Sequence, residues 1–136
     1  MMIYFTGYIA TLLTFAVVDM AWLATMTPRF YRPTLGDILI SGVNLPPAIV
    51  FYLLYPIGLL VFAMNPALKS GSIKTAIVYG ALFGFFTYAT YDLSNYATLR
   101  NWTLQLTLAD VAWGTILAAI ASTAAFWLVS KLIGVG

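Results

Sequence analysis

Four long apolar runs dominate the chain, and each is long enough to cross a membrane as a helix. They cover about residues 3–25, 45–64, 75–96 and 107–130, and roughly 20 residues suffice for a ~30 Å hydrocarbon core. Breaks rich in proline, glycine and polar residues separate them, in "TPRFYRP", "NPALKSGS" and "ATLRNW". The pattern predicts an all-α integral membrane four-helix bundle, a single domain over residues 1–136 with both termini on the same side.

Composition agrees with a membrane protein and excludes several kinds of chemistry. Of the 136 residues, 62% are hydrophobic and 7% are charged, whereas soluble domains contain about 25% charged residues. The net charge of +2 comes from scattered residues, so nucleic acid is not an expected partner. The sequence has no cysteine or histidine, which excludes disulfides, haem ligation by histidine, an ordinary zinc site and a histidine-based triad. No cofactor and no metal ligand set is indicated.

The basic residues divide by type between the two sides of the predicted bundle. The side with the termini holds the lysines and the opposite side holds the arginines: Lys69, Lys74 and Lys131 against Arg29, Arg32 and Arg100. The positive-inside rule gives nearly equal counts. We expect the lysine side to face the cytoplasm, because aspartates near the arginines can neutralise them.

Three aspartates lie at one predicted depth. Asp19, Asp92 and Asp110 each fall roughly 7–12 Å from the midplane, on the arginine side, at 1.5 Å rise per residue. Three different helices therefore contribute carboxyl groups to one layer.

Small residues indicate which way these carboxyl groups point. Steps of four residues lead from Asp92 to Gly84 and Gly80, and from Asp110 to Gly114. Positions four apart share one helix face, and small-residue ridges mark close contact between membrane helices. We expect the carboxyl groups to face the bundle interior.

A D-x-A-W pattern occurs in both the first and the fourth runs, as "VVDMAW" and "LADVAW". It places Trp22 and Trp113 one turn after an aspartate, on nearly the same face. An inverted repeat is one interpretation, and a site lined by paired aspartate and tryptophan is another. An interfacial aromatic belt is the structural alternative for Trp22 and Trp102, and for Trp113 either interpretation fits.

Each aspartate also has a structural interpretation. "TLAD" (Thr107–Asp110) fits a capping box, which would make Asp110 a first-turn residue. Asp19 and Asp92 lie near the C-terminal ends of their helices, where the helix dipole opposes a negative charge. An unpaired aspartate within a membrane helix costs about 2.5–3.5 kcal/mol. Each must be protonated, hydrated or paired with an arginine, and Arg100 could pair with Asp92.

Two readings of the aspartate layer follow: static ion pairs, or a working site. The candidate ligand-binding residues are Asp19, Trp22, Tyr91, Asp92, Asn95, Arg100, Asp110 and Trp113. The first hypothesis is binding or translocation of a small polar molecule, a cation or a proton. The alternatives are a structural or accessory subunit of a membrane assembly, and a membrane enzyme that modifies a lipid with Asp92 or Asp19 as acid or base. Expected partners are membrane lipids, a small-molecule or cation ligand, and further copies of the chain or a larger membrane complex.

The same motifs resemble one protein family over nearly the whole chain. The segments "VVDMAWL", "FYLLYPIGLLVFAMNPAL", "YGALFGFFTYATYDLSNYATLRNW" and "LTLADVAWGTIL" are similar to domain-of-unknown-function family 2177, small bacterial inner-membrane proteins. Ser94 stands where the family pattern often has threonine. The resemblance implies four membrane helices in a bacterial inner membrane and no assigned activity.

Overall fold

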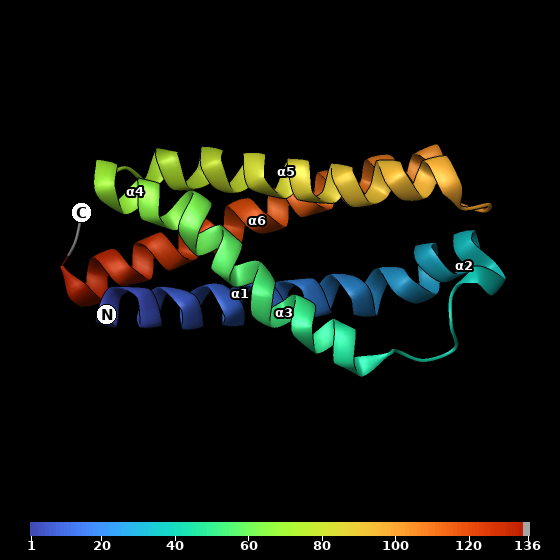
Figure 1. Cartoon of the computed structure of the whole chain (residues 1–136), viewed down its shortest axis with the longest axis horizontal. Helices are drawn as coiled ribbons and strands as arrows, with labels where there is room; N and C mark the ends of the chain where they lie inside the picture. Colours follow the sequence, from blue (N-terminus) through green and yellow to red (C-terminus); the bar gives the residue numbers. More distant parts are fainter. Residues whose placement is uncertain (135–136) are drawn as a thin grey trace.

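The computed structural model describes residues 1–134 as a bundle of four long helical segments (Figure 1). Two of these segments are single helices, α5 (Ile73–Thr98) and α6 (Leu104–Ile133). The other two are continuous runs of shorter helices: α1 (Met2–Met26), π-helix η1 (Thr27–Tyr31), α2 (Arg32–Leu35) and 3₁₀-helix η2 (Gly36–Ile38), then α3 (Leu45–Leu59), π-helix η3 (Leu60–Met64) and α4 (Asn65–Ser70). The predicted all-α membrane bundle is confirmed.

Helices α5 and α6 form the most extensive contact, and α1 packs along α6. Helix α3 crosses the bundle obliquely, so that the N-terminal end of α3 lies away from α5 (Figure 1). The N-terminus and the C-terminal end of α6 lie at the end that carries α4, and α2 lies at the opposite end with the α5–α6 turn (Figure 1). These two ends of the chain therefore share one side of the bundle, as the sequence predicts.

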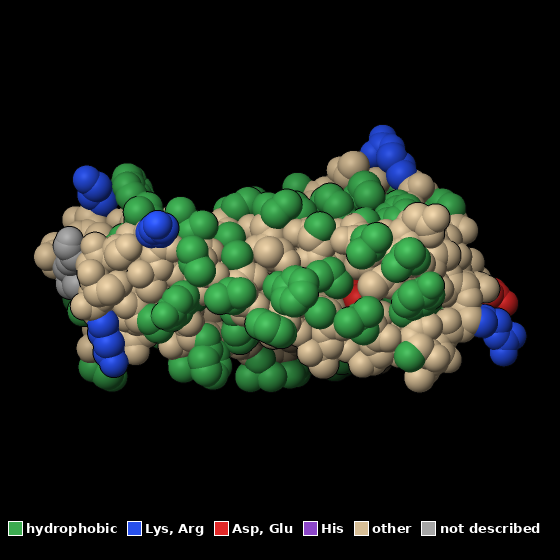
Figure 2. All heavy atoms as spheres, turned by 90° about the horizontal axis from the view of Figure 1, so that it is seen from above, with side chains coloured by type: hydrophobic (Ala, Val, Ile, Leu, Met, Phe, Trp, Pro, Cys, Tyr) green, Lys and Arg blue, Asp and Glu red, His purple; other side chains and the backbone are tan. Residues whose placement is uncertain are grey.

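The surface has the distribution of side chains that a lipid bilayer requires. Hydrophobic side chains cover the middle of the face in Figure 2, and Lys and Arg side chains gather at its two ends. Three helical segments are long and apolar enough to cross a membrane by length and composition: Met2–Ile38, Leu45–Ser70 and Leu104–Ile133. Helix α5 is less apolar because it carries tyrosines, threonines and Asp92, but it lies along α6 and has 26 residues.

Glycines allow α5 and α6 to approach closely. A Cβ atom on Gly84 would overlap the Gly114 carbonyl oxygen and the Ala118 side chain. One turn further, the Ser122 hydroxyl donates a hydrogen bond to the Ala76 carbonyl oxygen at 2.8 Å. The small residues predicted to share a face with the aspartates are therefore the residues at this helix–helix contact, which turns the carboxyl groups of α5 and α6 inward.

The second segment contains an irregular turn that begins four residues after Pro56. Pro56 has no N–H to continue the helical ladder, and the Leu60 N–H bonds the carbonyl oxygens of both Pro56 and Ile57. The helix then widens into η3, a π-type turn of the kind that often accompanies functional sites. The sequence predicts a kink at Pro56, and the structure contains this widened turn.

The predicted capping box at the start of the fourth helix is wrong. Helix α6 begins at Leu104, and the Thr103 side chain caps it by accepting a hydrogen bond from the Leu106 N–H at 3.1 Å. Thr107 donates its hydroxyl to the Thr103 carbonyl oxygen instead. Asp110 consequently lies inside the helix rather than in its first turn, and capping does not explain it.

The turn between α5 and α6 is tied to the end of the first segment. Asn101 has a positive φ of 71°, and its amide donates to the Leu35 carbonyl oxygen at 2.9 Å. Trp102 packs against Leu35 and Leu106 and is only 9% exposed. Trp102 therefore belongs to a small core at the end of the bundle.

Candidate functional site

An aromatic cavity with two carboxyl groups opens between α1, α3, α5 and α6. Its volume is about 630 Å³. The lining side chains come from all four helical segments: Asp19, Trp22, Leu23, Tyr31, Pro47, Ala48, Phe51, Tyr55, Thr87, Tyr88, Tyr91, Asp110 and Trp113. Seven of these are aromatic, and the described lining contains no basic side chain.

Asp19 is held in place by two hydrogen-bond donors from other helices. The Tyr52 hydroxyl of α3 donates to Asp19 Oδ2 at 2.5 Å, and Trp113 Nε1 of α6 donates to Asp19 Oδ1 at 3.0 Å. The residue is 6% exposed. Donors on both oxygens from two different helices fix the position and orientation of this carboxyl group.

Asp110 is held by a relay that starts at the other tryptophan. Trp22 Nε1 donates to the Tyr31 hydroxyl at 3.0 Å, and this hydroxyl donates to Asp110 Oδ1 at 2.5 Å. The hydroxyl thus accepts one hydrogen bond and donates another, which fixes the position of its proton. Asp110 is 9% exposed at the edge of the cavity.

The two tryptophans stack face to face between the aspartates. Their ring centroids lie 4.3 Å apart and the ring planes differ by 5°. Each indole N–H is directed toward the aspartate of the other helix, directly from Trp113 and through Tyr31 from Trp22. The two D-x-A-W motifs therefore interlock across the antiparallel α1–α6 contact, and both indole groups have hydrogen-bond partners within the bundle.

The π-helix η1 brings Tyr31 to this site. In an unbroken α-helix a residue nine positions after Trp22 would point about 180° away, at about 100° per residue. A π-type turn takes up about one extra residue, which reduces the offset to about 80°. The widened turn at Thr27–Tyr31 therefore lets Tyr31 reach both Trp22 and Asp110.

Asp92 lies beside Asp110, away from any arginine. It is 0% exposed, and both of its carboxyl oxygens lack a donor within residues 1–134. Its carboxyl group lies next to that of Asp110, because the α5–α6 contact sets Gly84 against Gly114 and Ala118, and Tyr88 against Gly114, so that one further turn brings Asp92 to Asp110. Arg100, the expected partner, is exposed at the end of the bundle, so the structure contains no Asp92–Arg100 bond.

The other two arginines bond to backbone carbonyl groups. Arg29 donates to the Thr25 carbonyl oxygen at 3.3 Å, and Arg32 donates to the Ile40 carbonyl oxygen at 3.4 Å. In the described part of the chain, therefore, no arginine contacts the aspartate layer. The contacts give no support to the interpretation of static ion pairs. Within the same residues, no group of three or more Asp, Glu, His or Cys side chains is placed to share a metal ion.

The cavity brings together five of the eight candidate residues: Asp19, Trp22, Tyr91, Asp110 and Trp113. Asp92 lies directly behind Asp110. Asn95 is half-buried outside the lining, and Arg100 is remote from it.

Sequence reasoning missed the contribution of α3, above all Tyr52 and Tyr55. Both hydroxyl groups find polar partners, Tyr52 with Asp19 and Tyr55 with the Thr87 hydroxyl at 2.9 Å. The available signal was two tyrosines three residues apart in an otherwise apolar helix, because hydroxyl groups within a membrane helix need partners on neighbouring helices.

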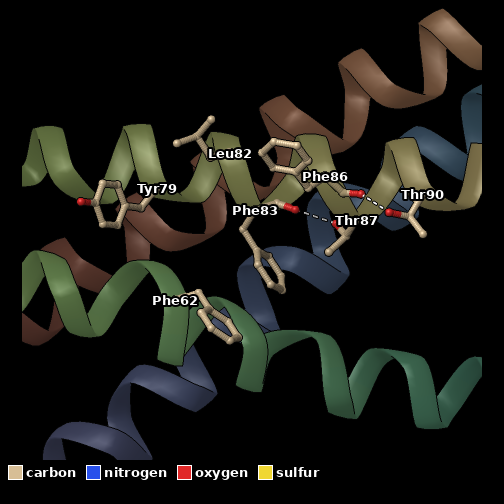
Figure 3. A pocket seen from close by; sticks show the side chains of 7 residues that line it. All are labelled: Phe62, Tyr79, Leu82, Phe83, Phe86, Thr87 and Thr90. Carbon is tan, nitrogen blue, oxygen red and sulfur yellow. Dashed lines mark hydrogen bonds between the residues drawn. The ribbon is translucent and has the colours of Figure 1, made fainter.

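A second hollow lies on the outer face, between η3 and α5 (Figure 3). In this view Phe83 points toward Phe62 of the facing segment, and the two rings stack with centroids 5.6 Å apart. Thr87 lines both this groove and the aromatic cavity. The Tyr55–Thr87 hydrogen bond therefore lies where the two hollows meet.

A family model described as "Predicted membrane protein (DUF2177)" matches residues 4–127. The chain belongs to this family. The match includes every residue that lines the cavity, so the aromatic site lies within the DUF2177 region. Neither the curated proteins nor the solved structures contain a match to the chain.

Proposed function

We propose that this DUF2177 protein binds a small organic cation, such as a quaternary ammonium ion or an amine, in the aromatic cavity. One observation supports this proposal above the others: seven aromatic side chains and two carboxyl groups surround a single cavity. The aromatic members are Trp22, Tyr31, Phe51, Tyr55, Tyr88, Tyr91 and Trp113.

The chemistry of the lining suits a cation with an apolar surface. An aromatic face attracts a cation by about 0.5–2 kcal/mol, and cages of such rings are the usual receptor for quaternary ammonium groups. The carboxyl groups of Asp19 and Asp110 add negative charge where water is largely excluded. The volume of about 630 Å³ lies within the usual range for small-molecule sites, roughly 300–1,000 Å³.

The lining favours an organic cation over a hydrated inorganic ion. Calcium requires six to eight oxygen ligands, whereas most of the lining is aromatic carbon and the two Asp19 oxygens already accept hydrogen bonds. We further expect that the protein lies in a bacterial inner membrane. We also expect that it carries the bound cation across this membrane.

Binding can be tested with purified protein in lipid nanodiscs. The ligands are choline, tetraethylammonium and tetrabutylammonium, with 3,3-dimethyl-1-butanol as the uncharged isostere of choline. Titration calorimetry should detect at least one of the cations, and the isostere should bind at least tenfold more weakly than choline or not at all. Equal affinity for choline and its isostere, or no binding of any cation, would refute the proposal.

Two matched substitutions separate the site from general charge effects. Asp19→Asn keeps the size of the side chain and an oxygen acceptor but removes the charge, so cation affinity should fall about tenfold or more. Asp37→Asn removes one exposed charge from η2, outside the cavity, and should bind cations as the unsubstituted protein does. If both variants lose the same affinity, the cavity is not the binding site.

A further inference from the structure

Asp92 and Asp110 form a pair of neighbouring carboxyl groups, and the aromatic cavity alone does not explain this pair. Asp92 is fully buried and has no donor for either oxygen within residues 1–134, and the carboxyl group of Asp110 lies beside it across the α5–α6 contact. Two neighbouring ionised carboxylates in a low-dielectric site repel each other strongly. One proton between them turns the repulsion into a hydrogen bond.

The surrounding donors indicate which aspartate holds this proton. Asp110 Oδ1 already accepts a hydrogen bond from the Tyr31 hydroxyl. Asp92 accepts no such bond. A proton on Asp92 that is donated to Asp110 therefore satisfies both side chains, and it removes an otherwise uncompensated buried charge.

The other titratable groups around the pair are phenols and a third carboxyl group, and none of them is a cation. Tyr31 reaches it from η1 and Tyr91 from its own helix, α5, while Asp19 faces Asp110 from α1. None of these groups carries positive charge, and Arg100 is exposed at the bundle end. A positive charge for the ionised pair must therefore come from a ligand.

Asp110 connects the pair to the cavity. It lines the cavity, whereas Asp92 lies outside the lining and behind it. A cation that approaches Asp110 lowers the cost of ionising its neighbour, since it screens the repulsion between the two carboxylates. The proton on Asp92 can then leave. The site gains the positive charge of the cation and loses that of the proton.

We infer that cation binding in the cavity is coupled to the release of one proton from the Asp92–Asp110 pair. The exchange is balanced: the Asp92 O–H bond breaks, the proton passes to solvent, and the cation takes its place as counter-charge. This inference rests on the proposed function, because it requires the cation to bind at the cavity.

The coupling can be measured on the whole protein in nanodiscs. Tetrabutylammonium, choline and tetraethylammonium are added in weakly buffered solution with a pH indicator, while calorimetry reports binding in the same samples. We expect up to one proton released per cation bound, and affinity that rises up to tenfold per pH unit where the pair is protonated.

Asp92→Asn is the informative variant, because an asparagine amide can donate to Asp110 as a protonated aspartate does. It should bind cations without releasing the proton, and its affinity should lose the dependence on pH. Asp37→Asn, the control, should release protons as the unsubstituted protein does. Monodisperse elution and an unchanged melting temperature establish that the variant is folded. The pH dependence of cation affinity in the unsubstituted protein tests the inference without any substitution.

The outcomes separate the inference from the proposal beneath it. Cation binding without proton release, or equal release from Asp92→Asn and unsubstituted protein, overturns the coupling and leaves the cation site intact. Absence of cation binding overturns both.

Discussion

At the scale of single residues, the two tryptophans decide how the aspartates are held. Trp22 and Trp113 stack on each other, and each sends its indole N–H toward the aspartate of the opposite helix, in one case through Tyr31. A short sequence repeat thereby becomes a reciprocal arrangement in space. This explains why a tryptophan follows each of these aspartates by three residues, a spacing that a membrane-surface belt does not require.

Trp113→Phe tests this arrangement. Phenylalanine keeps a ring for stacking but cannot donate to Asp19, and a hydrogen bond to a charged group contributes about 1.5–3 kcal/mol. We expect a lower melting temperature by circular dichroism in detergent, together with weaker cation binding. Trp127→Phe changes an exposed tryptophan on α6, 51% exposed, and should melt as the unsubstituted protein does. Equal melting of both variants would show that the indole donor contributes nothing.

At the scale of helices, glycine spacing sets how closely α5 and α6 pack, and therefore where the carboxyl groups meet. The sequence identifies this face, because Gly80 and Gly84 continue the side of α5 that carries Asp92. The sequence does not identify the π-turns. Widening at η1 brings Tyr31 to Trp22 and Asp110, contacts that are nine and 79 residues apart in the chain.

Gly84→Ala tests the closeness of this packing. The added methyl group would overlap the Gly114 carbonyl oxygen and the Ala118 side chain, and overpacking of this kind costs about 1–3 kcal/mol. We expect a clear fall in melting temperature and in the yield of monodisperse protein. Gly42→Ala adds the same group where nothing lies within 4 Å, so it should be nearly neutral. A stable Gly84→Ala protein would contradict close contact at this position.

At the scale of the whole molecule, the Lys and Arg side chains gather at the two ends of the bundle, and the three buried aspartates lie between these ends. The chain has no cysteine, which makes its topology directly measurable. Lys74 and Lys131 lie at the end with the termini and Arg100 lies at the other end, and all three side chains are exposed.

Single cysteines at these three positions test both the threading and the orientation. We expect Lys74→Cys and Lys131→Cys to resist a membrane-impermeant maleimide in intact cells, and Arg100→Cys to react, because the lysine side is predicted to be cytoplasmic. Labelling after permeabilisation is the control for each position. The reverse pattern would invert the orientation but keep the threading, whereas different results for the two lysine positions would contradict the bundle topology.

The sequence by itself determines the class of the protein, the number of helices and the depth of the aspartates, since these depend on hydrophobic length and on distance along a helix. It also indicates the inward face of α5 and α6, because small residues recur at helical spacing. Only the tertiary structure decides which groups meet: Tyr52 with Asp19, Tyr31 with Asp110, and Asp92 with Asp110 instead of Arg100. These contacts join residues 18 to 79 positions apart, and their partners depend on how the helices are rotated and on π-turns that local sequence does not specify.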